Sequence, residues 1–503
     1  MAPLLTAINR FRSAESGSTL AGRFTSGVFW SVAGNVAMKL FTAISSIAVA
    51  RILGPEGLGR LGMVQSTVAV FSVYAGFRMG NTAVKYVSEY RANDPEKAAS
   101  ILRMTTMVTF VLSAIVGIAL LALAPMVAVR LLKEPDLSTP IRIGSLLIFF
   151  SIYGAVRQQA LAGFEDFKSI AKINVTRGVL TPLICIPLAL FWGVPGAVLG
   201  FACVAALVVP QATLYLRRNG KRFNFPVSVD WPRLKAQLPV LWSFALPGFL
   251  VLLLMALTAW LGRLILTRQG NGMAALGLFE AANQWRTIVL FLPTTMARVV
   301  LPILCDTRRS GNGGDYGTAV AMQIRTVSLL TLPLIMLLIM LASPLSMVYG
   351  AKFSGIEAIL PILLASVYFS ALNESTRLIY ESSGRQWTGL GLYAIWGSVH
   401  LAACWLLVPR HGVYGFALAH LVSEVVLFLL QAFVADLYLS VKSIRLQFPL
   451  ILLAGLLFGF ACIARDMLQP SAWGTVSTVL VVCSLVPLAF AVREFRSQGA
   501  VCR

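Results

Sequence analysis

Residues 104–129 read MTTMVTFVLSAIVGIALLALAPMVAV, an apolar stretch without a charged side chain that is long enough to cross a bilayer as one helix. Similar stretches recur along the chain of 503 residues, of which 58% are hydrophobic and only 12% are charged, with a mean hydropathy of +0.81. Soluble domains carry about 25% charged residues. The repeated stretches therefore predict an all-α integral membrane protein.

The breaks between the apolar stretches predict about fourteen transmembrane helices. We expect them near residues 27–50, 60–80, 104–129, 141–163, 170–192, 195–216, 239–266, 274–301, 322–348, 356–380, 388–408, 412–435, 447–464 and 473–492. With a cytoplasmic N-terminus, the inner segments hold more than twice as many Lys and Arg residues as the outer segments. This excess follows the positive-inside rule and predicts that both termini are cytoplasmic.

Segments in the two halves of the chain resemble each other at a nearly constant offset. Residues 193–200 (GVPGAVLG) parallel residues 412–419 (GVYGFALA), and two further pairs of segments have nearly the same spacing. Six spans per repeat predict two six-helix lobes as a parallel pseudo-repeat, with the transport route between them. The expected parts are a cytoplasmic segment (1–26), an N-lobe (27–216), a basic cytoplasmic linker (217–238), a C-lobe (239–440), and two extra helices with a cytoplasmic tail (441–503).

Several motifs and compositional features argue against other classes of protein. The net charge of +21 does not indicate nucleic-acid binding, because the cations are spread thinly between apolar stretches. Residues 57–62 match the dinucleotide pattern G-x-G-x-x-G, but they follow a membrane helix and not a strand, so a tight turn with helix packing is favoured. The seven cysteines form no C-x-x-C pair and the three histidines are not clustered, so we expect no metal.

Polar side chains recur at helical spacing inside several predicted spans, which places them on one face of each helix. Candidates for a polar cavity lining are Asn35, Asn283, Gln284 and Asn373. The longest polar stripe, in the tenth span, comprises Ser366, Ser370, Asn373, Glu374, Arg377 and Glu381. Pairing of Arg377 with Glu374 and Glu381 along the helix is the alternative to a cavity-lining role for this stripe.

Cations inside or near the predicted spans are candidates for binding an anionic substrate. They are Lys39, Arg78, Arg157, Arg177, Arg263 and Arg286. A charge inside a bilayer costs several kcal/mol unless it faces a cavity or a partner. Snorkelling to the membrane interface is the alternative for Arg78, Arg177 and Arg263. A cationic cavity would suit a cargo with a diphosphate headgroup.

Acidic residues on the polar faces of the C-lobe spans are candidates for coupling transport to an ion. They are Glu280, Glu374 and Glu424, of which Glu374 is the weakest because Arg377 can neutralise it. No ATP-binding motif of the form G-x-x-x-x-G-K-[ST] occurs. We therefore expect no cofactor, and an ion gradient or the membrane potential as the source of energy.

Four segments carry a resemblance to a known family: residues 51–59 (RILGPEGLG), 86–90 (YVSEY), 162–167 (AGFEDF) and 276–282 (LGLFEAA). With them the chain resembles, over roughly residues 25 to 440, the bacterial polysaccharide and O-antigen flippases of the multidrug/oligosaccharidyl-lipid/polysaccharide exporter superfamily. The resemblance implies two lobes in a V, alternating access, and outward movement of an undecaprenyl-diphosphate-linked sugar across the bacterial inner membrane. Relatives often have Asp-Arg near the end of the seventh span, whereas this chain has Gly262-Arg263.

The predicted function is thus the flipping of an O-antigen, exopolysaccharide or capsule repeat unit, and not an enzymatic reaction. The alternatives are a lipid II flippase of peptidoglycan synthesis and a multidrug or cation antiporter of the same superfamily. A membrane polysaccharide polymerase is a further alternative, but the longest loop is the basic linker, which leaves no room for a catalytic domain. Expected partners are the lipid-linked glycan, membrane lipids and other polysaccharide-assembly proteins, without nucleic acid.

Overall fold

The computed structural model describes residues 20–226, 246–309, 313–383, 385–439 and 455. Within these ranges the chain is helical apart from short turns and contains no strand, which confirms the all-α fold. Eight of the described helices are long and apolar enough to cross a membrane. Apart from residue 455, the predicted spans at 447–464 and 473–492 lie outside the described residues, so the expected number of spans stays a prediction.

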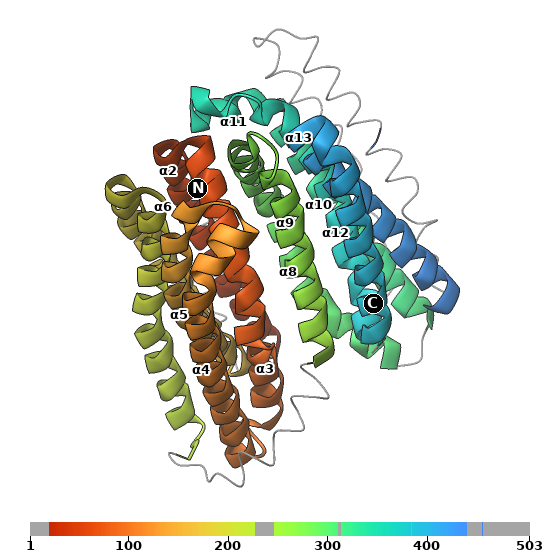
Figure 1. The fold of residues 1–503 in the computed structure, drawn as a ribbon. Helices are drawn as coiled ribbons and strands as arrows, with labels where there is room; N and C mark the ends of the chain where they lie inside the picture. Colours follow the sequence, from red (N-terminus) through yellow and green to blue (C-terminus); the bar gives the residue numbers. More distant parts are fainter. Residues whose placement is uncertain (1–19, 227–245, 310–312, 384, 440–454, 456–503) are drawn as a thin grey trace, which may run out of the picture. The chain divides into compact units, whose positions relative to one another are not determined.

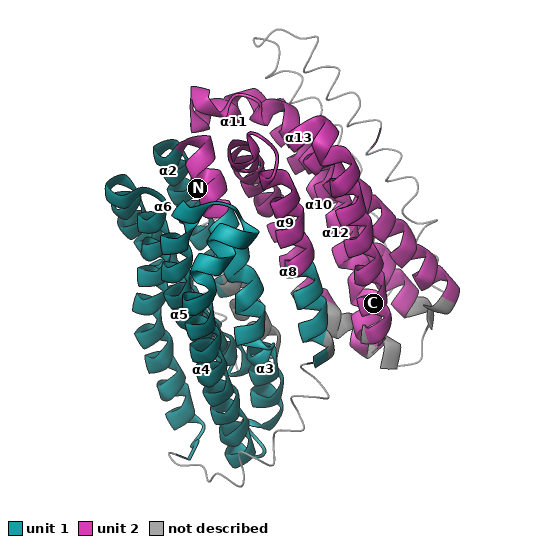
Figure 2. Cartoon of the chain, in the orientation of Figure 1, with its two compact units in different colours: residues 1–53, 63–256 teal, residues 54–62, 257–503 magenta. Residues whose placement is uncertain are grey.

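The chain divides into two compact units (Figure 2). Unit 1 comprises residues 1–53 and 63–256, and unit 2 comprises residues 54–62 and 257–503. The chain therefore enters unit 2 briefly, within its first long helix, before it returns to unit 1. The arrangement as two six-helix lobes stays a prediction.

Unit 1 is built around one central helix, α5. Its helices are α2 (Leu20–Gly76), α3 (Met79–Tyr90), α4 (Pro95–Met126), α5 (Ser138–Gly163) and α6 (Phe167–Arg222), with the first part of α8 (Leu246–Thr267). A short π-helix (Val127–Leu131) and a 3-10 turn (Pro135–Leu137) connect α4 to α5. The central α5 packs against α3, α4 and α6 (Figure 1).

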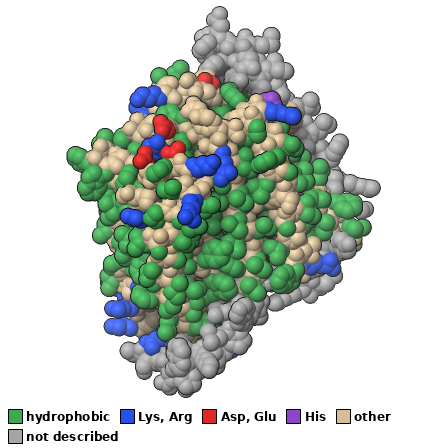
Figure 3. Space-filling model, in the orientation of Figure 1, with side chains coloured by type: hydrophobic (Ala, Val, Ile, Leu, Met, Phe, Trp, Pro, Cys, Tyr) green, Lys and Arg blue, Asp and Glu red, His purple; other side chains and the backbone are tan. Residues whose placement is uncertain are grey.

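The sequence of α4 explains both its start and its packing. Asp94 caps the helix by accepting a hydrogen bond from the backbone amide of Lys97 at 3.0 Å. Small side chains then line the buried face at steps of four residues, from Thr105 to Gly117, so that the backbone of α5 can approach closely. The opposite face is apolar and exposed, as at Ile118, which is 67% exposed. Exposed hydrophobic side chains are widespread on the face seen in Figure 3, as expected for contact with lipid.

Two long helices turn back on themselves at a glycine. In α6 the turn is at Gly193 (φ 61°, ψ −133°), and in α13 (Gln386–Leu439) it is at Gly412 (φ 55°, ψ −129°). A Cβ atom added at Gly200 would lie 2.8 Å from Cα of Cys185, so the two arms of α6 pack side by side. Each of these helices thus holds two of the predicted spans, joined by a turn of very few residues.

Replacing Gly193 or Gly412 with Ala should destabilise the protein by a similar amount, about 1–3 kcal/mol each, because a side chain disfavours this backbone conformation. Gly389→Ala is the matched control, since Gly389 lies in the helical part of α13 with open space around it. Thermal unfolding of the purified protein in detergent measures the effect. If Gly193→Ala or Gly412→Ala unfolds at the same temperature as Gly389→Ala, the backbone at that turn does not require glycine.

Unit 2 is likewise built around one helix, α12. Its helices are the rest of α8, α9 (Gly272–Arg309), α10 (Gly313–Met340), α11 (Ala342–Tyr349), α12 (Ile356–Ser382) and α13, with a 3-10 turn at Ala351–Phe353. The central α12 packs against α9, α10 and α13. Its buried face includes Leu360, Leu363, Leu364 and Val367, which are fully buried.

Some predicted boundaries were wrong. The predicted span at 322–348 is broken, because α10 ends at Met340 and the separate helix α11 follows. Pro344 explains the break, since its ring cannot donate the hydrogen bond that would continue α10. The predicted span at 60–80 ends earlier, at Gly76, where Phe77 and Arg78 adopt positive φ before α3 begins. The predicted span at 274–301 lies within α9, which extends beyond it at both ends.

The glycines at residues 57–62 serve helix packing within unit 2. This segment is helical and lies against the start of α9. A Cβ atom added at Gly59 would lie 1.8 Å from the carbonyl oxygen of Met273, and one added at Gly277 would lie 1.8 Å from that of Pro55. The two backbones are in direct contact, so the G-x-G-x-x-G pattern marks a helix crossing here and not a nucleotide site.

Candidate functional site

Arg157 projects from α5 in unit 1 and is held by uncharged groups. Its guanidinium donates to the hydroxyl of Thr213 on the second arm of α6 and to the hydroxyl of Tyr153, one turn back on α5. The guanidinium carbon also lies 3.9 Å from the centre of the Tyr153 ring, in a cation–π contact. Phe110 and Phe149 pack edge-on and stacked around the same ring, so an aromatic cluster positions the arginine.

Arg177, on the first arm of α6, ends a chain of amide side chains. Its Nη2 donates to Oε1 of Gln158 at 3.2 Å, and Nε2 of Gln158 donates to Oδ1 of Asn174 at 2.6 Å. Nδ2 of Asn174 in turn donates to Oδ1 of Asn35 on α2 at 3.2 Å. Among the described residues, no carboxylate bonds to Arg157 or Arg177. Neither guanidinium is therefore neutralised by a carboxylate of the described part of the chain.

The two other candidate cations of unit 1 have different surroundings. Lys39, on the first part of α2, is half-buried and has no hydrogen-bond or ion-pair partner among the described residues. Arg78 occupies the break between α2 and α3, where its side chain lies against the backbone of Gly248 at the start of α8. Arg78 therefore lies at a helix junction, and it does not belong to the chain of amide side chains that ends at Arg177.

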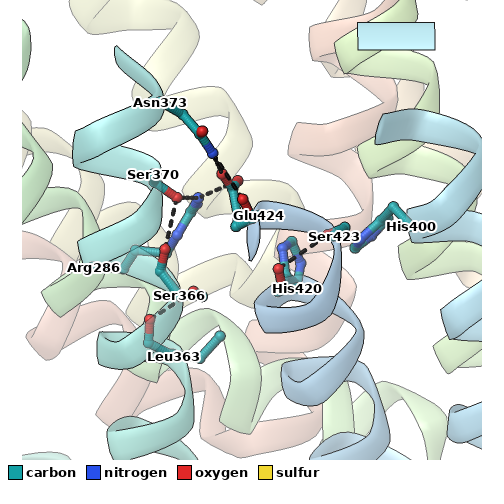
Figure 4. A network of polar contacts seen from close by, with 9 residues as sticks. All are labelled: Arg286, Leu363, Ser366, Ser370, Asn373, His400, His420, Ser423 and Glu424. Carbon is teal, nitrogen blue, oxygen red and sulfur yellow. Dashed lines mark hydrogen bonds and ion pairs between the residues drawn. The ribbon is translucent and has the colours of Figure 1, made fainter. Parts of the chain in front are cut away.

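In unit 2 the candidate cations and the candidate acids form pairs. Nε of Arg263 donates to Oε1 of Glu280 at 2.8 Å, which joins α8 to α9. Nη2 of Arg286 lies 3.7 Å from Oε1 of Glu424, which relates α9 to α13 (Figure 4). The charges of these two pairs cancel, so unit 2 has no counterpart of the unpaired arginines in unit 1 among its described buried residues.

The polar stripe of α12 is largely an internal ion-pair network. Arg377 pairs with Glu374 at 2.6 Å and with Glu381, the arrangement that the helix spacing of the three residues allows. The carboxylate of Glu374 is thus neutralised within its own helix, as the alternative interpretation of this stripe holds. Asn373, by contrast, faces α13 and donates to Oε2 of Glu424 at 2.8 Å.

The remaining amide candidates support neighbouring groups. Nδ2 of Asn283 lies 3.5 Å from Oε2 of Glu280, so it extends the Arg263–Glu280 pair. Oε1 of Gln284 accepts a hydrogen bond from the hydroxyl of Tyr349 at 2.9 Å, which ties α9 to α11. The four candidates chosen as a polar lining therefore belong to four separate groups of contacts.

Two buried histidines lie beside the Arg286–Glu424 pair. The ring centres of His400 and His420 on α13 are 4.5 Å apart, and Nδ1 of His400 is 3.1 Å from Oγ of Ser423 (Figure 4). The Phe279 ring stacks on His420. Nε2 of His420 is buried without a hydrogen-bond partner among the described residues.

Residues 48–358 match the model of a family described as polysaccharide biosynthesis protein. The chain belongs to this family. It is 20% identical over 324 residues to the EPS I polysaccharide export inner membrane protein EpsE of Ralstonia nicotianae, an alignment that covers 62% of this chain and 71% of EpsE. It is 25% identical over 167 residues to the lipid III flippase of Escherichia coli, which covers 33% of this chain and 40% of that protein.

Solved structures share the fold of this polysaccharide biosynthesis family protein. The lipid II flippase MurJ, in an inward closed conformation, aligns with a TM-score of 0.69 and 14% identity, covering 94% of this chain and 99% of MurJ. A transporter of the MOP superfamily from Pyrococcus furiosus aligns with a TM-score of 0.62 and 18% identity, covering 83% of this chain and 96% of that one. The resemblance drawn from the sequence is confirmed, and the protein is a multi-pass membrane protein with the fold of this superfamily.

Some residues that shape the site of this polysaccharide biosynthesis family protein escaped the sequence analysis. Tyr153 was detectable, because it lies one helical turn before Arg157. Gln158 and Thr213 were not, because they meet Arg177 and Arg157 from other helices or helix arms. The contact between the rings of His400 and His420 was also missed, because the two residues lie on different arms of α13.

Proposed function

We propose that this protein flips an undecaprenyl-diphosphate-linked oligosaccharide across the bacterial inner membrane, and that the cargo is an O-antigen, exopolysaccharide or capsule repeat unit. One observation carries the proposal: the membrane-spanning helices of unit 1 hold Arg157 and Arg177 with uncharged partners alone among the described residues. Membership of the polysaccharide biosynthesis family supports the same class of substrate.

The bonding of these arginines suits a diphosphate better than a cationic drug. A guanidinium inside a bilayer is costly unless an anion or a cavity compensates it. Groups such as Tyr153 and Gln158 orient Arg157 and Arg177 but do not neutralise them. Each arginine can therefore offer a fork of donors to phosphate oxygens, whereas a cationic substrate would be repelled. Lys39 would add a third positive charge in the same unit.

The amide chain next to Arg177 supports a role in sugar recognition. Gln158, Asn174 and Asn35 present donors and acceptors from three different spans of unit 1. Amide groups can exchange their mutual hydrogen bonds for those of sugar hydroxyls with little cost. We assign a contact with the diphosphate to these arginines, without excluding contacts elsewhere in the chain, and a contact with part of the glycan to these amides.

We further propose that the two halves are a structural repeat that works by alternating access. The turns at Gly193 and Gly412 have nearly the same φ and ψ, and the residues are 219 positions apart in the sequence. Added Cβ atoms at Gly196 and Gly415 would meet the carbonyl oxygens of Leu188 and Leu407, pairs that keep this offset. The central helices α5 and α12 hold the predicted fourth and tenth spans, as six spans per repeat requires.

The orientation that we propose places both termini and residues 217–238 in the cytoplasm, because these segments hold a marked excess of basic residues. Labelling of single cysteines with a membrane-impermeant thiol reagent in spheroplasts tests it. Labelling at position 410 without labelling at position 221 is expected, and the reverse pattern would contradict the orientation.

Deletion of the gene and analysis of lipid-linked oligosaccharides test the function itself. We expect a polysaccharide repeat unit to accumulate on the inner leaflet and the matching surface polysaccharide to disappear, and a plasmid copy should restore both. Accumulation of lipid II would instead support the peptidoglycan alternative. Unchanged lipid-linked intermediates together with increased sensitivity to cationic drugs would support the antiporter alternative.

A further inference from the structure

The Arg286–Glu424 pair is the loosest of the ion pairs formed by the candidate cations and acids in unit 2. Nη2 of Arg286 lies 3.7 Å from Oε1 of Glu424, whereas Arg263 is 2.8 Å from Glu280 and Arg377 is 2.6 Å from Glu374. Nη2 of Arg286 also donates to Oγ of Ser370 at 3.2 Å, and its Nε is buried without a partner among the described residues. The guanidinium therefore has donor capacity that Glu424 does not use.

The two partners differ in how firmly they are held (Figure 4). Glu424 is fixed by Asn373, whose Nδ2 donates both to Oε2 at 2.8 Å and to the backbone carbonyl of Glu424 at 3.0 Å. The side chain of Glu424 is 9% exposed within the protein, whereas that of Arg286 is 21% exposed. Arg286 is thus the more exposed partner of the pair, while Asn373 holds the carboxylate in place.

We infer that Glu424 is an internal counter-ion that competes with the diphosphate of the substrate for Arg286, so that binding of the anion makes Glu424 take up a proton. The inference rests on the proposed function, and it assigns the coupling between substrate binding and proton uptake to the Arg286–Glu424 pair. When the phosphate oxygens bond to Arg286, the carboxylate of Glu424 loses its positive partner. A buried carboxylate without a partner is strongly unfavourable, and one proton from water neutralises it to the acid while Arg286 stays protonated.

The groups that face the pair leave Glu424 as the acceptor of this proton. The Arg263–Glu280 pair, from α8 and α9, already balances its own charges. His400 and His420, on the same helix as Glu424, lie between aromatic rings and would add a net positive charge if protonated. A proton on Glu424 instead removes a buried charge, because it converts the carboxylate to the neutral acid.

Anion binding and proton binding are thermodynamically linked, so each changes the affinity for the other in the same direction and by the same factor. If anion binding drives proton uptake, a lower pH must favour anion binding by the same factor, and couplings of this kind typically amount to about 5–150-fold. The affinity for a diphosphate should therefore rise as the pH falls. Glu424→Gln keeps a hydrogen-bonding oxygen toward Asn373 but cannot gain a proton, so only the pH dependence that comes from titration of the diphosphate itself should remain.

The test uses the full-length protein in nanodiscs and farnesyl diphosphate as the probe. Calorimetry in buffers of different ionisation enthalpy counts the protons taken up on binding. We expect the wild type to take up about one proton more than Glu424→Gln does. Proton exchange by the probe itself is the same for both proteins, so it drops out of this difference. Glu374→Gln is the matched control, because Glu374 is paired with Arg377 in the same unit, and it should behave like the wild type.

Two further variants keep the test decisive. Arg286→Gln removes the shared partner, so the probe should bind more weakly and the proton uptake should disappear even if Glu424→Gln folds poorly. His420→Gln should leave the uptake unchanged. Equal uptake by the wild type and Glu424→Gln would overturn the inference and leave the proposed function standing. Loss of uptake in His420→Gln alone would overturn the assignment to Glu424, and failure of the wild type to bind the probe would overturn the inference and the proposed function together.

Discussion

Replacing Arg157 and Arg177 together with Gln should lower the rate of headgroup translocation by about a hundredfold or more. A hydrogen bond to a charged group contributes about 1.5–3 kcal/mol, so each arginine that contacts phosphate accounts for roughly a tenfold effect or more. Gln keeps a donor toward Thr213 or Gln158, so the variant should fold. Movement of a fluorescent lipid-linked oligosaccharide in proteoliposomes measures the rate.

Arg103→Gln is the matched control for this pair, because Arg103 is an exposed arginine on α4 in the same unit. It should translocate at the wild-type rate. Lys39→Ala should also reduce export at unchanged membrane levels of the protein, and the combination of Lys39→Ala with Arg157→Ala should abolish it. Full export by that combined variant, or a wild-type rate in the double Gln variant, would contradict a cationic substrate site in unit 1.

Gly277→Leu should prevent unit 2 from folding. A Cβ atom at this position would lie 1.8 Å from the carbonyl oxygen of Pro55, a contact that the backbone can relieve only by moving apart. Overpacking of this kind typically costs about 1–3 kcal/mol for a few added carbons and more where backbone must shift. Gly277→Ala should therefore lower the unfolding temperature measurably, and Gly277→Leu should yield little folded protein by size-exclusion chromatography.

Gly391→Leu provides the comparison for this series, because Gly391 lies in α13 with open space around it. It should behave like the wild type. A Gly277→Leu protein that elutes and unfolds like the Gly391→Leu protein would show that the two helices are not in close contact at this point.

The helical architecture was predictable from the sequence because its signal is strong and local. An apolar stretch of bilayer length leaves few alternatives, and the breaks at Gly193 and Gly412 were placed correctly by composition alone. The break after Met340 was missed, because Leu341 and Ala342 continue the apolar pattern and only Pro344 interrupts the hydrogen bonds.

The candidate site was predictable in its residue types but not in its pairings. Arg377 and Glu381 are one turn apart on one helix, so their contact follows from the sequence. Arg286 and Glu424 belong to α9 and α13, and no local pattern relates them. The sequence therefore suggested separate roles for a cation and an acid that the structure brings together.

The helical segment at residues 54–62 belongs to unit 2, although the residues on both sides of it belong to unit 1. The two units are therefore not consecutive, independent segments of the chain. A piece of chain beginning at the basic linker would lack the helix against which Gly277 packs, and its end of α9 would expose bare backbone to lipid. The N-terminal half must be translated first to supply that surface, so the order of synthesis matches the order in which unit 2 can be completed.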